Sequence, residues 1–333
     1  MEMFEHFRLV ADPGQAPLRI DKFMAGHLEG TSRSRVQAAI RSGYVEVNGG
    51  PAKANMVIKA GDVIVFKMPY PKRNTEIVPQ EIPLDIVYED DDVIVINKPA
   101  GMVVHPGNGH FEGTLVNALA HYLGISTEDE RLGLLVHRID MDTSGLLVVA
   151  KNEKSQTDLA GQFFVHSIER KYNAVVWGNI AEDAGTVDLN IARDPSDRLK
   201  FRAYRPESGI GKNAVTHFRV LERFGYVTLV ECELETGRTH QIRVHMAALG
   251  HPLFNDSRYG GSDIRKGTIY NKYRQFIKNC FELCPRQALH ARTLGFRHPS
   301  TGEVVRFEVP LPADMTALLE RWRKYASNMP AEE

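Results

Sequence analysis

Residues 137–145, HRIDMDTSG, place a high density of polar and charged side chains between two apolar runs, LLV and LLVVAK. Asp140 stands where the first run ends, and Asp142 precedes a Thr-Ser-Gly turn that leads into the second run. A carboxylate at a strand end beside a tight turn is held rigidly and can still face a cleft, so Asp140 is a candidate base or nucleophile. Asp142 is better suited to capping the turn by accepting backbone N–H groups.

A buried carboxylate stays ionised only if a cation or hydrogen-bond donors replace its lost hydration. The segment ETGRTHQIRVH, residues 235–245, supplies two candidate cations, Arg238 and Arg243, at the opening of an expected helix. An ordinary helix start needs one capping residue and little else, so this polar density favours a second part of the same site. His240 and His245 are out of register for one helix face, and a metal site is not expected there.

The composition is that of a globular chain with two domains. It has 333 residues, 43% of them hydrophobic, and a formal net charge of -1, which by itself indicates no nucleic-acid partner. Three sparse cysteines, Cys232, Cys280 and Cys284, fit buried thiols in a reducing compartment. The sequence has no long apolar run and no signal-peptide pattern, so we expect a cytoplasmic protein without a membrane partner. It also has no Gly-rich phosphate loop and no convincing Cys/His metal spacing, so we expect no cofactor and no metal.

Residues 1–68 are expected to form a small basic domain. LRIDKFMAGHLEG and SRSRVQAAIRSG predict two helices, with Ser32 as N-cap of the second and Gly43 just after its end, and YVEVNG and DVIVF predict two strands. The second helix carries or adjoins three arginines, Arg33, Arg35 and Arg41. Such arginines give salt-dependent affinity for RNA, although their charge alone is equally consistent with a solvated helix face.

A proline-rich segment, 69–83, is expected to link this domain to a second one, 84–326, which a tail, 327–333, follows. We expect strands in the second domain at 145–150, 172–177, 214–220, 226–234 and 303–309, and helices at 113–123, 152–165, 239–249, 267–281 and 314–326. Strands and helices alternate irregularly with short links, so the predicted fold class is α+β with a mixed, mostly antiparallel sheet. The stretch 260–286 is expected to be a peripheral insertion.

Six motifs occur in one order along the chain: NKPAGMVVHPG, HRIDMDTSG, RKYNAVVWG, TGRTHQIRVH, GHPLFNDSRYG and QALHA. They resemble the motif set of the RluA/RluD family of pseudouridine synthases, and the basic domain in front resembles the alpha-L RNA-binding domain, as in the RluD branch. The resemblance implies a largely antiparallel sheet bent around an RNA-binding cleft. It also implies isomerisation of uridine in structured RNA, in which the N1–C1′ bond breaks and C5 joins C1′ without a cofactor.

The resemblance implies catalytic roles for three residues. Asp140 matches the essential aspartate, which either attacks C1′ or acts as a base on the sugar. Tyr172 matches the tyrosine that stacks on the extruded base and helps to remove the C5 proton; an ordinary strand aromatic facing the core is the alternative. Arg243 matches the arginine that pairs with the catalytic carboxylate.

The resemblance also implies contacts with RNA at four other positions. Arg138 matches an arginine that fills the stack vacated by the flipped uridine, with a surface salt bridge as the alternative. Lys98 and His105 are expected on the cleft rim, although either could be structural. Leu289 is expected to form an apolar wall beneath the base, unless it is an ordinary core leucine.

The expected substrate is a stem-loop of large-subunit ribosomal RNA, free or in a ribosomal subunit, and the expected protein is a monomer. Transfer RNA is the alternative substrate. The alternative function is a non-catalytic RNA-binding or ribosome-assembly factor. Such a factor needs basic residues but no buried acid, so the joint presence of Asp140, Tyr172 and Arg243 favours the enzyme.

Overall fold

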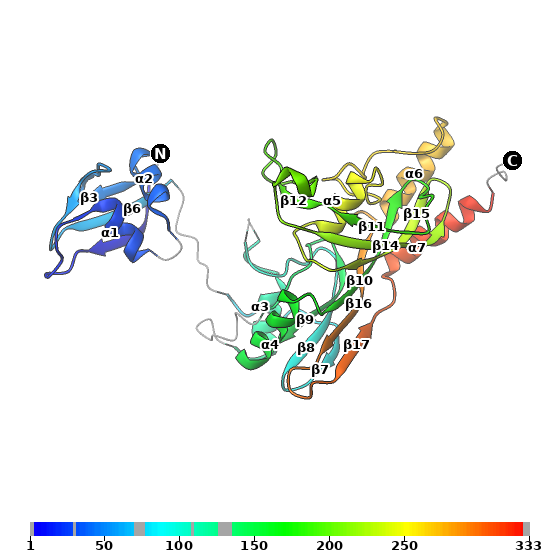
Figure 1. Cartoon of the computed structure of the whole chain (residues 1–333), viewed down its shortest axis with the longest axis horizontal. Coiled ribbons are helices and arrows are strands. Elements are labelled where there is room, and N and C mark those ends of the chain that lie inside the picture. The colour runs from blue at the N-terminus through cyan, green and yellow to red at the C-terminus, as the bar shows by residue number, and fades with distance from the viewer. Residues whose placement is uncertain (1–2, 29–30, 70–76, 108–109, 126–134, 329–333) are drawn as a thin grey trace. The chain divides into compact units, whose positions relative to one another are not determined.

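The computed structural model describes residues 3–28, 31–69, 77–107, 110–125 and 135–328. The chain divides into two compact units, Met1–Thr75 and Glu76–Glu333, which are described separately (Figure 1). Residues 70–76 of the expected linker and 329–333 of the expected tail lie outside the described residues. Within the described part of the chain, no helix is long and apolar enough to cross a membrane.

Unit 1 packs two helices against a small antiparallel sheet. Its elements are α1 (Ile20–His27), α2 (Arg33–Arg41), a sheet in the order β1 (Phe4–Val10), β6 (Val63–Met68), β3 (Val45–Val47), β4 (Gly50–Pro51), and a separate pair, β2 (Leu18–Arg19) and β5 (Val57–Ile58). The expected cap of α2 is confirmed, because Ser32 Oγ accepts the Arg35 N–H and Gly43 follows the helix with a φ of +75°. The sequence prediction lacks β1 because this strand buries few side chains.

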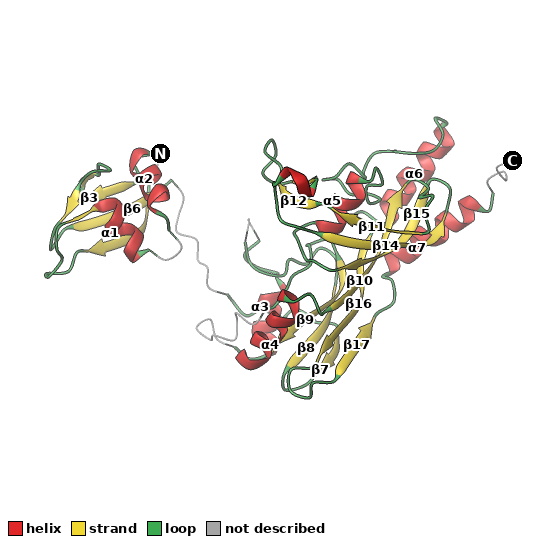
Figure 2. Ribbon diagram, in the orientation of Figure 1, coloured by secondary structure: helices red, strands yellow, loops and turns green. Residues whose placement is uncertain are grey.

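Unit 2 is built around a nine-stranded sheet (Figure 2). Its order is β11 (Ala184–Asp188), β14 (Val215–Arg223), β15 (Val227–Leu234), β10 (Glu169–Trp177), β16 (Leu289–Arg297), β9 (Ser144–Ala150), β8 (Val93–Lys98), β7 (Ile86–Glu89), with β17 (Val304–Glu308) also paired to β16. The pairing of β9 with β16 is parallel and the other pairings in this sheet are antiparallel. The predicted mixed, mostly antiparallel α+β class is therefore confirmed. A short pair, β12 (Asn190–Arg193) and β13 (Phe201–Tyr204), lies outside the sheet.

Alternation along the strands assigns different helices to the two faces of this sheet. The helices are α3 (Leu115–Tyr122), α4 (Glu153–Phe164), α5 (Gln241–Ala248), α6 (Asn271–Leu283) and α7 (Ala313–Ala326). In β10, Tyr172, Ala174 and Val176 pack in a cluster that includes α5. Val175 and Trp177, on the opposite face of β10, pack with α6 and α7. The two-residue period of the strand therefore turns Tyr172 toward α5.

Strand β16 is missing from the sequence prediction although it lies near the middle of the sheet. Eight of its nine residues are buried or partly buried, so no alternation of polar and apolar residues marks it. His290, Arg292 and Thr293 interrupt its apolar pattern further. A strand buried on both faces and carrying polar side chains has neither of the usual sequence signals.

The expectation that residues 260–286 form a peripheral insertion is wrong. Tyr273, Ile277 and Cys280 of α6 are buried in the same hydrophobic cluster as Trp322 of α7. The apolar stripe of this amphipathic helix is thus part of the core. The expected burial of Cys280 and Cys284 is confirmed, because both residues are fully inaccessible to solvent.

Strand β9 starts at a very close backbone contact. Gly145 has a φ of +110° and lies opposite Ala291 in the parallel pairing with β16. A Cβ atom on this glycine would stand 2.2 Å from the carbonyl oxygen of Ala291. Only glycine fits here, so the residue that ends the HRIDMDTSG motif is fixed against a strand that lies far along the chain.

Candidate active site

Side chains from several separate segments of unit 2 line one cavity of about 400 Å³. Five of the residues singled out in the sequence line it together: Arg138, Asp140, Tyr172, Arg243 and Leu289. They come from the loop before β9, from β10, from α5 and from the start of β16. The fold thus brings four of the six motifs to one place.

Asp140 and Arg243 form the expected ion pair. Nη1 of Arg243 donates to Oδ2 of Asp140 at 2.9 Å, and the Asp140 side chain remains 21% exposed. Asp256, which is fully buried, holds the other edge of the guanidinium: Nε donates to Oδ2 at 2.7 Å and Nη2 to Oδ1 at 2.9 Å. This bidentate bond fixes the arginine, so its remaining donor is aimed at Asp140.

Arg243 stays cationic in this setting. Burial disfavours its charge, but the hydrogen bonds and negative charges of Asp256 and Asp140 outweigh that effect and raise the pKa of the guanidinium. The role of Asp256 was not predicted from the sequence, because in GHPLFNDSRYG this aspartate looks like a turn residue. It does accept the backbone N–H groups of Arg258 and Tyr259, at 3.0 Å and 3.1 Å, besides holding Arg243.

His240 lies beside the second oxygen of Asp140. It precedes α5 in the left-handed region, with a φ of +57°, and its Nε2 lies 3.9 Å from Asp140 Oδ1. Its Nδ1 lies 2.7 Å from the Tyr259 hydroxyl. Burial lowers the pKa of His240 to about 4 although the charge of Asp140 opposes this shift. The ring is therefore neutral near pH 7, and Arg243 supplies the positive charge next to Asp140.

Tyr172 and Leu289 form an apolar wall of the cavity. They are 7% and 4% exposed and pack in one cluster with Ile139. Burial raises the pKa of the Tyr172 phenol, and the charge of Arg170 opposes this rise. The hydroxyl is thus protonated at neutral pH, and the ring offers a flat apolar surface against which a planar base can stack.

Arg170 is a further cavity-lining cation, beyond those expected from the sequence. It is only 6% exposed, and its Nη2 donates to the carbonyls of Leu234 and Glu235 at 3.4 Å and 3.2 Å. Its Nε has no hydrogen-bond partner among the described residues. A Cβ atom on Gly237 would stand 2.6 Å from its Nη1, so a glycine there makes room for the guanidinium. Two-residue alternation from Tyr172 could have predicted that Arg170 faces the same side.

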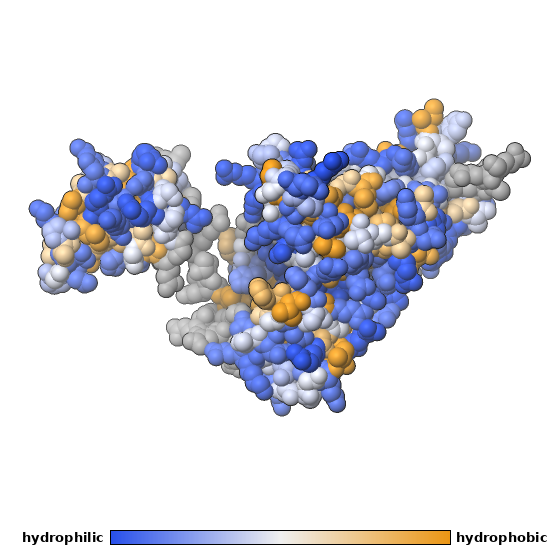
Figure 3. Space-filling view, viewed as in Figure 1, coloured by the Kyte–Doolittle hydropathy of each residue, from blue (hydrophilic) through white to orange (hydrophobic). Residues whose placement is uncertain are grey.

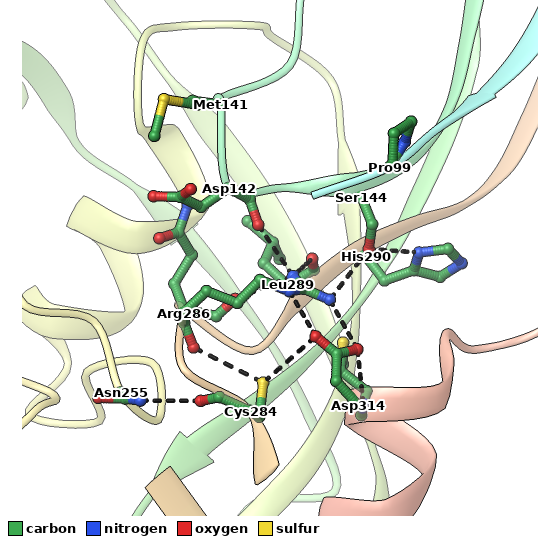
Figure 4. Close-up of polar contacts among 12 residues, drawn as sticks. Pro99, Met141, Asp142, Ser144, Asn255, Cys284, Arg286, Leu289, His290 and Asp314 are labelled. Atoms are coloured by element: carbon green, nitrogen blue, oxygen red, sulfur yellow. Dashed lines mark hydrogen bonds and ion pairs between the residues drawn. The ribbon is translucent and has the colours of Figure 1, made fainter. Parts of the chain in front are cut away.

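A buried arginine supports the loop that carries Asp140 (Figure 4). Arg286 donates through Nη1 to the backbone carbonyl of Asp142 at 2.9 Å and through Nη2 to Ser144 Oγ at 3.2 Å. Asp314, from the first turn of α7, accepts two hydrogen bonds from the same guanidinium, at 2.7 Å and 3.0 Å. Helix α7 is thereby connected to the loop that carries Asp140. No sequence pattern indicated this role for Arg286, because its acceptors include main-chain atoms.

Lys98 supports the same loop, so of the two roles expected for it the structure shows the structural one and not a place on the cleft rim. Its side chain is fully buried, and Nζ donates to the carbonyls of Pro99, Met102 and Met141 at 2.7 Å, 2.9 Å and 2.9 Å. Three carbonyls match the three donors of an ammonium group. The NKPAG motif therefore holds the residue that follows Asp140.

Lys98 gives a pH-dependent contribution to stability. Burial lowers the pKa of Lys98 from 10.5 to about 7, and the negative charge of Asp142 opposes this shift. Between about pH 7 and about pH 10 the unfolded chain then binds more protons than the folded one, so stability rises with pH by up to about 1.4 kcal/mol per unit. We expect wild type to gain stability relative to Lys98→Met over this range, measured by urea denaturation at each pH. A constant difference would show that Lys98 keeps its proton in the folded protein.

The other predicted residues lie as follows. Arg138 is exposed at the cavity and makes no ion pair with a described residue, so the salt-bridge alternative is not found. His105 is exposed and does not line the cavity; its Nδ1 lies 3.1 Å from the Pro106 carbonyl oxygen. The turn after Asp140 closes through the Thr143 N–H, which donates to the Asp140 carbonyl at 3.1 Å. No described residue donates a hydrogen bond to the Asp142 carboxylate, so the expected side-chain cap by Asp142 is not found.

The three arginines of unit 1 differ in their surroundings. Arg33 donates to the buried carboxylate of Asp21 at 3.0 Å and helps, with Gln37 and Arg19, to lower the pKa of that group. Its side chain is still 52% exposed. Arg35 and Arg41 are exposed on α2. Arg33 therefore joins α1 to α2, and all three side chains remain accessible to a partner.

The described residues offer metal-ligand geometry at one place away from the cavity. Asp90, Asp92 and His298 have ligand atoms within 4.8 Å of one another. Asp90 already accepts from the Tyr88 hydroxyl at 2.7 Å and Asp92 from the Ser155 hydroxyl at 2.8 Å, and these bonds account for the cluster without an ion. The cavity is lined by one carboxylate, Asp140, together with three histidines and four arginines, so its lining suits an anion or a polar ligand better than a metal cation.

Comparison with known proteins agrees with this geometry. The family model described as RNA pseudouridylate synthase matches residues 92–248, which include Asp140, Tyr172 and Arg243. The S4 domain model matches residues 18–64, within unit 1. The chain is 49% identical over 319 residues to the uncharacterized RNA pseudouridine synthase YlyB of Bacillus subtilis, covering 95% of this chain and 98% of that protein.

Two further relatives extend the comparison. The chain is 44% identical over 315 residues to ribosomal large subunit pseudouridine synthase D of Xylella fastidiosa, covering 93% of this chain and 91% of that protein. The solved structure of human RNA pseudouridylate synthase domain containing 1 superimposes with a TM-score of 0.53 at 25% identity, over 78% of this chain and 99% of that one. The similarity in sequence to both relatives extends over more than nine tenths of this chain.

Proposed function

The chain belongs to the RNA pseudouridylate synthase family, and from this premise we propose that it isomerises uridines in a stem-loop of large-subunit ribosomal RNA. The observation that carries the proposal is the Asp140–Arg243 ion pair at 2.9 Å, in a cavity walled by Tyr172 and Leu289. The relatives named ribosomal large subunit pseudouridine synthase D support the choice of RNA.

The cavity supplies what the isomerisation requires. The base lies against the apolar wall of Tyr172 and Leu289, and its sugar lies next to Asp140. Arg243 occupies Oδ2 of Asp140 and keeps the carboxylate oriented, so Oδ1 is the oxygen available to the sugar. Both routes for the aspartate, attack on C1′ and removal of a sugar proton, use this ionised oxygen. The reaction conserves every atom of the uridine, so the chain's own residues can carry it out.

The uridine must leave its stack before it can enter the cavity, at a cost of about a few kcal/mol. Arg138 is exposed at the cavity, two residues before Asp140, and makes no ion pair with a described residue. Its guanidinium can therefore fill the space that the base vacates. This position accounts for the dense charge of HRIDMDTSG: one side chain faces the RNA and the next charged one faces the sugar.

Unit 1 is proposed as an RNA anchor. Arg33, Arg35 and Arg41 are accessible on α2, and phosphate contacts by such residues strengthen binding without regard to sequence. Asp140, Tyr172 and Arg243 meet within a single chain, and we propose that the protein acts as a monomer. The three buried, free thiols fit a reducing compartment, and we place the protein in the cytoplasm.

The test uses RNA from a strain that lacks the corresponding synthase. The purified protein is incubated with that RNA, and pseudouridines are mapped by chemical modification followed by reverse-transcription stops. We expect new stops in the large-subunit ribosomal RNA. New stops in transfer RNA alone would show that transfer RNA, and not ribosomal RNA, is the substrate. No new stop in naked RNA or in ribosomal subunits, despite RNA binding, would favour a non-catalytic assembly factor.

A further inference from the structure

The C-terminal end of α4 forms a rigid turn beside the cavity. The Val165 N–H donates to the Gly161 carbonyl at 3.0 Å, and the Ser167 N–H donates to the Gln162 carbonyl at 3.0 Å. His166 lies in the left-handed region with a φ of +59°, a backbone conformation that residues other than glycine rarely adopt. These backbone hydrogen bonds therefore define the path of the main chain through the turn.

The two phenylalanines of this turn have opposite environments, although both line the cavity. Phe163 is partly buried: its ring stacks on His137 with centroids 4.5 Å apart, and the Arg170 Cζ lies 5.4 Å from its centroid. Phe164 is 83% exposed, and Val165 beside it is 66% exposed. The fold thus partly buries one ring of the pair and leaves the other exposed to water at the edge of the cavity.

Phe164 shares the cavity with cationic side chains. Arg138, which is exposed, and Arg238, which is partly exposed, line the same cavity. The viewed face of unit 2 is largely hydrophilic, with hydrophobic side chains in small patches (Figure 3). An exposed aromatic ring among arginines suits a polyanion that carries flat apolar groups. Single-stranded RNA has these two properties, and its bases stack on aromatic side chains.

We propose that Phe164 is a stacking platform for an unpaired nucleobase next to the flipped uridine. The inference rests on the proposed function and adds a requirement on the substrate. Arg138 fills the position in the RNA base stack that the flipped uridine vacates. Phe164 stacks on a neighbouring base that has also left the stack. The target is then a uridine whose neighbour in the RNA is also unpaired, with little demand on the identity of that neighbour, because every base has a flat face.

This role is tested by steady-state kinetics on a stem-loop RNA in which the wild-type protein forms pseudouridine. We expect Phe164→Ala to raise KM about tenfold, since stacking of one base is worth about 1–3 kcal/mol, while kcat at saturating RNA changes less than about twofold. Phe164→Trp, which keeps a stacking surface, restores KM. Ile269→Ala is the matched control, because Ile269 is 82% exposed and does not line the cavity. The thermal midpoints of all these variants should equal that of wild type.

Abasic RNA identifies the stacked base. An abasic residue placed in turn at each neighbour of the target should raise KM for wild type at one position, and Phe164→Ala should show no further increase there. Additive effects at every position would overturn the inference, as would a KM for Phe164→Ala equal to that of wild type. If wild type forms no pseudouridine in any RNA, the proposed function fails instead, and the two failures are thus distinguishable.

Discussion

Asp140→Asn should lower the rate of pseudouridine formation by about a thousandfold or more, while the thermal midpoint and the affinity for RNA stay close to those of wild type. The amide has the shape of the carboxylate but is neither a nucleophile nor a base, so either route through Asp140 is lost. The fold is spared because Arg243 keeps its bidentate partner Asp256. Single-turnover kinetics with labelled RNA measure the rate, and a filter-binding titration measures the affinity.

The matched control is Asp91→Asn, the same chemical change at an exposed carboxylate in the turn between β7 and β8. We expect it to keep wild-type kinetics. If Asp140→Asn retained a rate within about tenfold of wild type, Asp140 would not be the catalytic carboxylate, whatever its place in the cavity.

Arg243→Met should both unfold more easily and be inactive. It leaves Asp256 fully buried without its cation and removes the donor from Asp140. Breaking one side of a buried ion pair costs about 3–5 kcal/mol, which for a domain of this size lowers the thermal midpoint by about 10 °C. Calorimetry measures the stability, and the pseudouridine assay measures the activity.

The double variant Arg243→Met/Asp256→Asn separates charge from packing. It removes the unpaired charge along with the arginine, so we expect it to regain at least about half of the lost free energy of unfolding. It should remain inactive, because Asp140 still lacks its partner. Equal instability of the single and double variants would mean that the packing of Arg243, rather than its ion pair with Asp256, stabilises unit 2.

The sequence predicted the site better than it predicted the support behind the site. Asp140, Tyr172 and Arg243 stand in recognisable motifs, and the need of a buried acid for a cation is general, so their meeting could be foreseen. Asp256 could not, because a carboxylate in a turn has the same appearance whether it binds backbone amides alone or an arginine as well.

Main-chain acceptors explain why the sequence left two roles open for Lys98, a place on the cleft rim and a structural role. Its Nζ donates to three carbonyls that only the folded loop brings together, so the sequence alone could not choose between them. Arg286 escaped notice for the same reason. Strand β16 was not predicted from the sequence because burial on both faces removes the alternation by which a strand is recognised. The fold class was predictable because it depends on the number and spacing of elements rather than on any one contact.

The parallel contact between Gly145 and Ala291 has a consequence for synthesis of the chain. The loop that carries Asp140 is complete early, yet the strand and the arginine that hold it are made about 140 residues later, near the C-terminal end of unit 2. Contacts of such long sequence separation form late in folding. A nascent chain that has exposed only its first 280 residues or so therefore has its RNA-binding unit but no ordered active site. Activity should appear only after translation has passed β16.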